Sequence, residues 1–134
     1  MSKLSAFLHP VTTSEEKEVV ISNRFQDESG QPVPFKIRAL TQEENDAITR
    51  QATRRRKEGG QTIEQLDSVD FTRRMVVAAT VEPVFSSKEL CDGCGVMLQL
   101  LVPGKLLLSG EYARLVKEIT KLSGFAEQED EVKN

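Results

Sequence analysis

The stretch that decides the fold spans residues 33–44 and reads Val33-Pro34-Phe35-Lys36-Ile37-Arg38-Ala39-Leu40-Thr41-Gln42-Glu43-Glu44. In its first half Val33, Phe35 and Ile37 follow a two-residue repeat, with Lys36 and Arg38 between them, as in a strand with one buried face. Its second half is a capping box, in which the side chains of Thr41 and Glu44 each accept a hydrogen bond from the other residue's backbone amide. The stretch therefore predicts a strand followed at once by a helix.

A partner for this strand precedes it in the chain. Val19 and Ile21 share the two-residue alternation, and a polar turn over residues 26–32 separates the two segments. Gly30 in that turn can adopt the positive φ that other residues resist. We predict an antiparallel β-hairpin. Because Pro34 has no backbone N–H to donate, we expect its strand to lie at a sheet edge.

The helix that begins after Thr41 is predicted to run into the basic cluster Arg54-Arg55-Arg56-Lys57. Acidic residues lie early in this segment and basic residues lie late, which complements the helix dipole. Gly59-Gly60 is expected to end the helix, and the residues up to Ile63 are expected to form a flexible loop.

Four further segments carry helical signals. A helical pattern begins at Asp67, although its β-branched residues leave a strand as an open alternative, and Pro83 ends it either way. A second capping box at residues 86–89 opens a short helix, and Pro103 suits the first position of another. The strongest amphipathic pattern covers residues 112–122. The predicted fold is α+β, with an N-terminal antiparallel β-hairpin packed against four to five short α-helices.

The length of 134 residues fits one domain. We expect a flexible N-terminus over residues 1–15, a single α+β domain over 16–125 and a disordered acidic tail over 126–134. Residues 1–10 lack the continuous apolar stretch of a signal peptide, and polar residues interrupt the apolar run at 96–108. We therefore expect neither a membrane span nor export, which places the chain in the cytoplasm.

The sequence contains no motif that is typical of catalysis or of cofactor binding. The single histidine, His9, lies in the expected flexible N-terminus, and no glycine-rich phosphate loop is present. Cys91 and Cys94 have the spacing of a zinc or redox pair, but a structural zinc site needs four ligands. We interpret them as reduced cysteines, with a metal or redox role as the disfavoured alternative. No catalytic, metal-binding or cofactor-binding residue is predicted.

A surplus of large apolar residues marks one segment. Nine of them fall within thirteen positions, namely Val96, Met97, Leu98, Leu100, Leu101, Val102, Leu106, Leu107 and Leu108. They can all belong to the core, or some can form a groove for an apolar partner helix. Leu98, Leu101 and Leu107 are the candidate partner-binding residues.

A second candidate surface is basic. On the predicted helix, Arg50, Arg54 and Lys57 lie within about 60° of one another at 100° per residue. Arg55 and Arg56 point elsewhere, so a solvated helix end is the favoured interpretation and an acidic protein or nucleic acid is the alternative. The net charge of −3, from 18 basic and 21 acidic residues, argues against nucleic-acid binding.

Several blocks of this sequence resemble the XkdN-like phage tail assembly chaperones. The first covers residues 22–44, from Ser22-Asn23-Arg24-Phe25 through Gly30 to the capping box. Others follow in order, namely Ala78-Ala79-Thr80-Val81-Glu82-Pro83, Leu107-Leu108-Ser109-Gly110-Glu111-Tyr112 and Ser123-Gly124-Phe125. Together they span residues 18–125, but they do not include Cys91 and Cys94.

The resemblance implies a non-enzymatic phage or prophage protein that acts in the host cytoplasm and is absent from the mature virion. Such chaperones bind the long tape measure protein and recruit tail tube subunits. The resemblance does not assign the binding face to particular residues of this sequence. It also leaves open whether the chain forms homo-oligomers. The alternative function is a small nucleic-acid-associated or protein-interaction adaptor that uses Arg50, Arg54 and Lys57.

Overall fold

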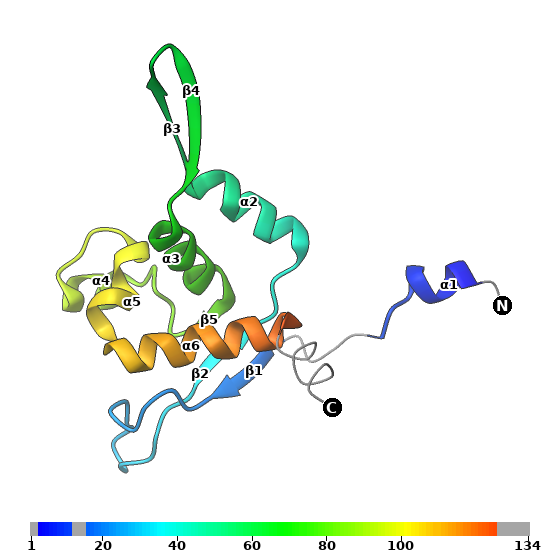
Figure 1. Cartoon of the computed structure of the whole chain (residues 1–134). Helices are drawn as coiled ribbons and strands as arrows, with labels where there is room; N and C mark the ends of the chain where they lie inside the picture. The colour runs from blue at the N-terminus through cyan, green and yellow to red at the C-terminus, as the bar shows by residue number, and fades with distance from the viewer. Residues whose placement is uncertain (1–2, 12–15, 126–134) are drawn as a thin grey trace.

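The computed structural model describes residues 3–11 and 16–125, so the predicted acidic tail lies outside the described residues. The elements are, in chain order, α1 (Lys3–Leu8), β1 (Glu16–Val19), β2 (Phe35–Arg38), α2 (Gln42–Ala52), β3 (Thr53–Glu58), β4 (Gln61–Leu66), α3 (Ser68–Ala79), β5 (Thr80–Glu82), α4 (Lys88–Cys94), the 3-10 turn η1 (Gln99–Leu101), α5 (Val102–Leu106) and α6 (Ser109–Leu122). Figure 1 shows the β1–β2 hairpin beside the helices α2 to α6. The α+β prediction is confirmed.

A three-stranded antiparallel sheet has the order β1-β2-β5, and Val19 pairs with Phe35 at one end of the hairpin. The predicted hairpin is therefore confirmed, and Gly30 in its connection has the expected positive φ of 85°. The prediction of an edge strand was wrong, because β2 is central. Pro34 lies just before the first paired residue, Phe35, so its missing N–H removes no hydrogen bond from the ladder.

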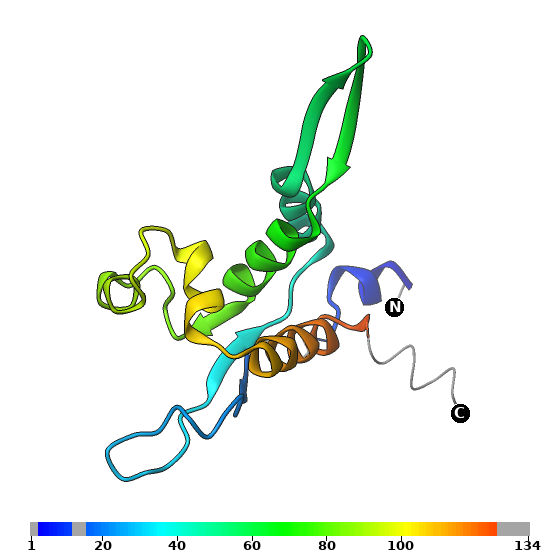
Figure 2. The ribbon, with the colours of Figure 1, turned by 60° about the vertical axis from the view of Figure 1, so that its left-hand side comes forward.

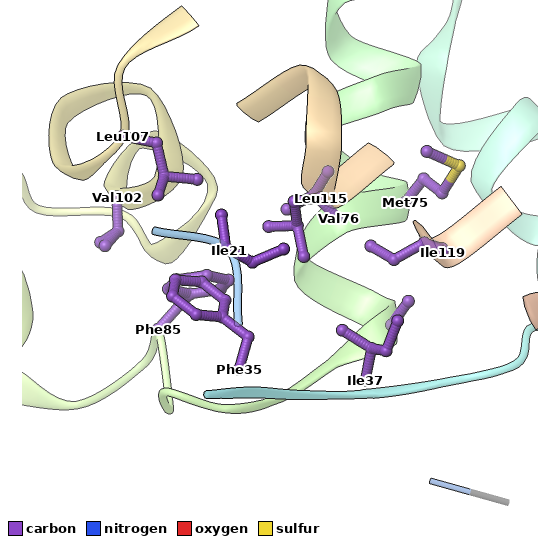
Figure 3. Close-up of a cluster of buried hydrophobic side chains, with 11 residues drawn as sticks. Ile21, Phe35, Ile37, Met75, Val76, Phe85, Val102, Leu107, Leu115 and Ile119 are labelled. Carbon is purple, nitrogen blue, oxygen red and sulfur yellow. The ribbon is translucent and has the colours of Figure 1, made fainter. Parts of the chain in front are cut away.

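The core lies between one face of this sheet and the helices α3 and α6. Phe35 and Ile37 of β2 are buried, whereas Lys36 between them lies on the other face. Figure 3 shows Val76 of α3 and Leu115 of α6 meeting at the centre of the cluster. The apolar stripe predicted for residues 112–122 thus packs inward, with Leu115 and Ile119 completely buried.

The capping box of α2 is confirmed: Thr41 Oγ1 accepts from the Glu44 amide at 3.2 Å, and Glu44 Oε1 accepts from the Thr41 amide at 3.1 Å. The predicted length of this helix was wrong. It ends at Ala52, and the basic cluster forms β3, which pairs with β4 from Thr53 opposite Leu66 to Glu58 opposite Gln61. Figures 1 and 2 show this hairpin projecting from the body.

The predicted flexible loop at residues 59–63 was also wrong. Gly59 and Gly60 both have positive φ, 60° and 81°, and form the tip of the β3–β4 hairpin. Two-residue hairpin turns of type I′ need positive φ at both central positions, which only glycine adopts without strain. The two glycines therefore reverse the chain within the hairpin.

The helix predicted from Asp67 and its strand alternative are each correct for part of the segment. Residues 68–79 form α3, and the next three residues form β5, which pairs with β2. The helix predicted at residues 86–89 exists, but its capping box was wrong, since α4 begins at Lys88 and the Ser87 side chain makes no capping hydrogen bond. The short helix predicted at Pro103 exists as α5, but it begins at Val102, so Pro103 occupies its second position instead of its first.

The described part of the N-terminal segment contains α1, a helix that the sequence pattern does not indicate. None of its residues is buried. Among the helices of residues 3–11 and 16–125, none combines the length and apolar character that crossing a bilayer requires.

Candidate partner-binding surface

The apolar segment 96–108 divides between core and surface. Met97 is 97% exposed, Leu98 60% and Leu101 38%, whereas Leu107 is only 8% exposed and packs in the core cluster. We call Met97, Leu98 and Leu101 the apolar turn. Surface exposure of Leu107 was therefore a wrong expectation, whereas Leu98 and Leu101 do lie at the surface.

The local backbone explains why Leu107 is buried while its neighbour Leu108 is exposed. Leu107 and Leu108 both have extended φ and ψ between α5 and α6. Successive side chains of an extended chain point to opposite sides. The side chain of Leu107 therefore enters the core beside Val102, as Figure 3 shows, and Leu108 faces solvent.

The apolar turn is held by its own hydrogen bonding and by the helices beside it. The Leu101 amide donates to the Leu98 carbonyl at 3.0 Å, and η1 packs against α3. Val102 and Pro103, which follow directly, are buried. The exposed side chains of the turn are thus attached to a fixed part of the domain, which lowers the ordering cost when a partner binds.

Two hollows flank this region. One has a volume of about 300 Å³ and lies between α3 and the α5–α6 junction, where Val69 and Tyr112 line it. The other has a volume of about 340 Å³ and is almost wholly apolar; we call it the apolar pocket. It is lined by Phe25, Val33, Pro34, Phe35, Glu82, Pro83, Leu90 and Leu106.

An ion pair between distant parts of the chain holds the 20–34 connection onto α6. Arg24 binds Glu111 through two hydrogen bonds, Nε to Oε2 at 2.8 Å and Nη2 to Oε1 at 2.5 Å, and also donates to the Leu106 carbonyl at 3.1 Å. Glu111 accepts from the Leu108 amide at the start of α6. The Arg24 guanidinium, together with the Ser22 hydroxyl and this amide, lowers the pKa of Glu111 to about 2.

Sequence reasoning missed the role of Arg24, because its partner Glu111 lies 87 positions away. The hydrogen bond from the Leu108 amide to Glu111, by contrast, joins residues only three positions apart. A second paired carboxylate is Glu44, whose pKa the Arg38 guanidinium and the Thr41 amide lower to about 2. These two ion pairs fix the connections on either side of β2.

We expect acid to destabilise the domain as the pH falls from about 4.5 to about 2. Glu44 and Glu111 have pKa values near 2 when folded and an ordinary value of 4.5, so the unfolded chain takes up their protons first. The stability that both carboxylates contribute is present above the ordinary value and is lost across this range. Thermal melts at a series of pH values should show a smaller acid-induced drop in Tm for Glu44→Gln and Glu111→Gln than for the wild type. An identical pH dependence in all three proteins would contradict the assignment.

The three basic candidates do not form one patch. Arg50 lies on α2, Arg54 at the base of the β3–β4 hairpin and Lys57 near its tip, and residues three apart in a strand face opposite sides. Arg54 donates to Asp70 Oδ2 at 3.0 Å and to the Gln51 carbonyl at 3.2 Å. The predicted common helix face was therefore wrong, because this segment is a strand.

Acidic neighbours neutralise most of the hairpin's positive charge. Arg55 pairs with Glu64 directly across the two strands at 3.0 Å, and Arg56 lies 3.5 Å from Glu58. Asp70 is buried and also binds Arg74, which together with Arg54 lowers its pKa. Arg54 thus links the hairpin to α3.

We expect a titration of this chain with duplex DNA or single-stranded RNA at low salt to be flat. A protein binds nucleic acid when its free cationic side chains neutralise phosphates and so release the counterions condensed on them. Here the arginines of β3 are already paired with carboxylates. Fluorescence anisotropy of a labelled oligonucleotide measures this. Salt-sensitive binding that disappears in the Arg50→Ala/Lys57→Ala variant would contradict the expectation.

Both cysteines lie on α4 and are partly buried against the core. The Cys91 thiol donates to the Phe85 carbonyl at 3.3 Å. In residues 3–11 and 16–125, no group of three or more histidine, cysteine, aspartate or glutamate side chains is placed to hold a metal ion.

The fold and these surfaces define a small α+β domain with exposed apolar side chains on a fixed turn, the kind of surface that binds other proteins. Residues 4–134 match the family model described as Phage XkdN-like tail assembly chaperone protein, TAC. The chain therefore belongs to the XkdN-like phage tail assembly chaperones, as its sequence blocks predicted.

Two relatives from Bacillus subtilis (strain 168) support the assignment to this family. The chain is 31% identical over 127 residues to the phage-like element PBSX protein XkdN, covering 90% of this chain and 86% of that protein. It is 35% identical over 114 residues to the uncharacterized protein YqbN, covering 84% and 76%. The crystal structure of YqbN superposes with a TM-score of 0.75 at 32% sequence identity, covering 93% of this chain and 98% of that chain.

Proposed function

We propose that this chain binds the tape measure protein of its phage tail, keeps that protein in solution during assembly and recruits tail tube subunits to it. The observation that carries the proposal is the apolar turn, Met97, Leu98 and Leu101, exposed on a fixed segment between α4 and α5. Membership of the tail assembly chaperone family supports it. The proposed role is non-enzymatic and belongs to the host cytoplasm, before the tail is complete.

The chemistry of the apolar turn suits an amphipathic helix. Fully burying a leucine or methionine side chain contributes about 1.5–3 kcal/mol. Methionine is flexible and polarisable, so Met97 can adapt to different apolar partners. A helix that lays one apolar face along the turn would bury Met97 and Leu98 together. A long helical protein carries many such faces, and covering them prevents aggregation.

Capture from a co-expression host tests the proposal. The affinity-tagged chain is co-expressed with the tape measure protein of the same phage, and the purified material is analysed by mass spectrometry. We expect the tape measure protein to co-purify with the chain. A folded, tagged chain that captures no tape measure protein would overturn the proposal.

A further inference from the structure

The hollow between α3 and the α5–α6 junction continues the surface of the apolar turn. We call it the α3–α5 hollow; it is lined by Val69, Arg73, Gly104, Leu107, Ser109 and Tyr112. Leu101 of the apolar turn has helical φ and ψ, and α5 follows it directly, so Gly104 lies one helical turn further along. Residues three apart in a helix share a face. Leu101 and the wall of the hollow at Gly104 therefore belong to one surface.

Gly104 keeps the α3–α5 hollow open. A Cβ built on this glycine would have no heavy atom within 4 Å, so a larger side chain would fit there without a clash. On the α3 wall, Val69 is 59% exposed, and Leu107 is the buried residue of the lining. A volume of about 300 Å³ is at the small end of ligand pockets. The hollow therefore suits a single apolar side chain of a partner.

The rim of this hollow carries a positive charge that the domain itself does not neutralise. Arg73 is exposed and lies one turn after Val69 on α3, and both line the hollow. Asp70, the nearest carboxylate on α3, is already bound by Arg74 at 2.8 Å and by Arg54 at 3.0 Å. Within the described part of the chain, no ion pair or side-chain hydrogen bond involves Arg73. Arg73 is therefore available to a carboxylate of a partner.

Tyr112 adds a hydroxyl group to the same rim. Burial raises the pKa of Tyr112, and the nearby charge of Arg73 acts in the opposite direction. A protonated phenol donates a hydrogen bond, and a guanidinium adds donors that carry charge, so the two groups together suit a carboxylate. None of the described residues that line the hollow is acidic. The hollow thus combines apolar walls with a rim that attracts negative charge.

We propose that the α3–α5 hollow and the apolar turn together bind an amphipathic helix of the tape measure protein that carries a glutamate or aspartate beside its apolar anchor. The anchor, a leucine or phenylalanine, enters the hollow between Val69 and Gly104. The carboxylate, three or four positions away on the same helix face, binds Arg73 and the Tyr112 hydroxyl. This inference rests on the proposed function and adds a rule for which segments bind, because the positive rim repels a basic residue in the same place.

Overlapping peptides of the tape measure protein of the same phage, each of about 20 residues so that a helix can form, test the charge rule. Fluorescence anisotropy measures their binding to the full chain. We expect the tightest binders to carry an acidic residue three or four positions from a large apolar one, and to bind more weakly as salt is added. Arg73→Glu should bind these peptides at least about tenfold more weakly, since it places like charges together. Lys57→Glu makes the same change of charge on the β3–β4 hairpin, which projects from the body (Figure 1), and should bind like the wild type.

Gly104→Leu tests the hollow without changing a charge. Leucine is a better helix former than glycine, so the variant should keep or raise the Tm. It should bind the same peptides at least about tenfold more weakly, because the filled hollow leaves the apolar anchor exposed. Gly110→Leu is the matched control. Gly110 of α6 also has open space around its Cβ, but it lies about 200° around the helix from Tyr112, so this variant should bind like the wild type.

The outcomes separate this inference from the proposed function. The inference alone is overturned if the wild type captures the tape measure protein but shows no preference for acidic peptides. It is also overturned if Arg73→Glu and Gly104→Leu bind as tightly as the wild type. A wild-type chain that binds neither the whole tape measure protein nor any of its peptides would overturn the proposed function, and this inference with it.

Discussion

Leu107→Asp is expected to unfold the domain, with a loss of at least about 4 kcal/mol in the free energy of unfolding. Truncating a buried leucine costs about 2–5 kcal/mol, and a carboxylate at this position would be buried without a partner. Leu107 is 8% exposed and packs in the cluster of core side chains. Since small domains are stable by only about 5–15 kcal/mol, urea titrations followed by circular dichroism should show little folded protein.

The conservative variant Leu107→Met provides the control. It keeps the apolar volume, so it should cost less than about 1.5 kcal/mol. A Leu107→Asp variant that melts near the wild-type Tm would contradict the burial of this residue and would return it to the candidate partner surface.

The double variant Met97→Asp/Leu98→Asp is expected to keep the fold and lose at least about 100-fold in affinity for the tape measure protein. Both side chains are exposed, so the free energy of unfolding should change by less than about 1 kcal/mol. Burying either side chain in the complex should contribute about 1.5–3 kcal/mol to the binding free energy. A loss of about 2.7 kcal/mol corresponds to about a 100-fold loss of affinity. Competition binding with the co-purified complex measures the loss.

Val20→Asp is the matched control, because Val20 is also an exposed apolar residue but lies beside β1, away from the apolar turn. It should bind like the wild type. If the control and the double variant lost the same affinity, the apolar turn would not be the binding surface. Either that surface would lie elsewhere, or the added negative charge alone would explain the loss.

Local signals in the sequence predicted the elements that local interactions hold. The capping box at Thr41 and Glu44 and the apolar stripe of α6 involve residues within one or two turns of a helix. The same is true of the β1–β2 hairpin, where alternation and the glycine of the turn agree. These elements, and the α+β class that follows from them, were predicted correctly.

The β3–β4 hairpin was missed because its signal is not local to the basic cluster. Arginine and lysine are good helix formers, so Arg54 to Lys57 extend the preceding helical pattern. The strand forms because residues 61–66 pair with it across the Gly59-Gly60 turn, with Arg55 opposite Glu64. The paired glycines were the available sign of a hairpin, and they were interpreted as a helix end and a loop.

The candidate surface was predicted in part for a similar reason. The surplus of apolar residues at 96–108 identified the segment, but composition does not show which side chains point inward. Leu107 and Leu108 are chemically identical neighbours, and only the extended backbone between α5 and α6 sends one to the core and the other to solvent. The Arg24–Glu111 pair and the apolar pocket depend on contacts between distant segments, which sequence spacing does not reveal.

The most direct test is the fraction of tape measure protein that stays soluble after co-expression with this chain. With the wild-type chain we expect the tape measure protein in the soluble fraction, and with Met97→Asp/Leu98→Asp we expect it in the insoluble fraction while the variant itself stays soluble and folded. A tape measure protein that is equally soluble with both chains, or insoluble with the wild type, would contradict the proposed role of the apolar turn.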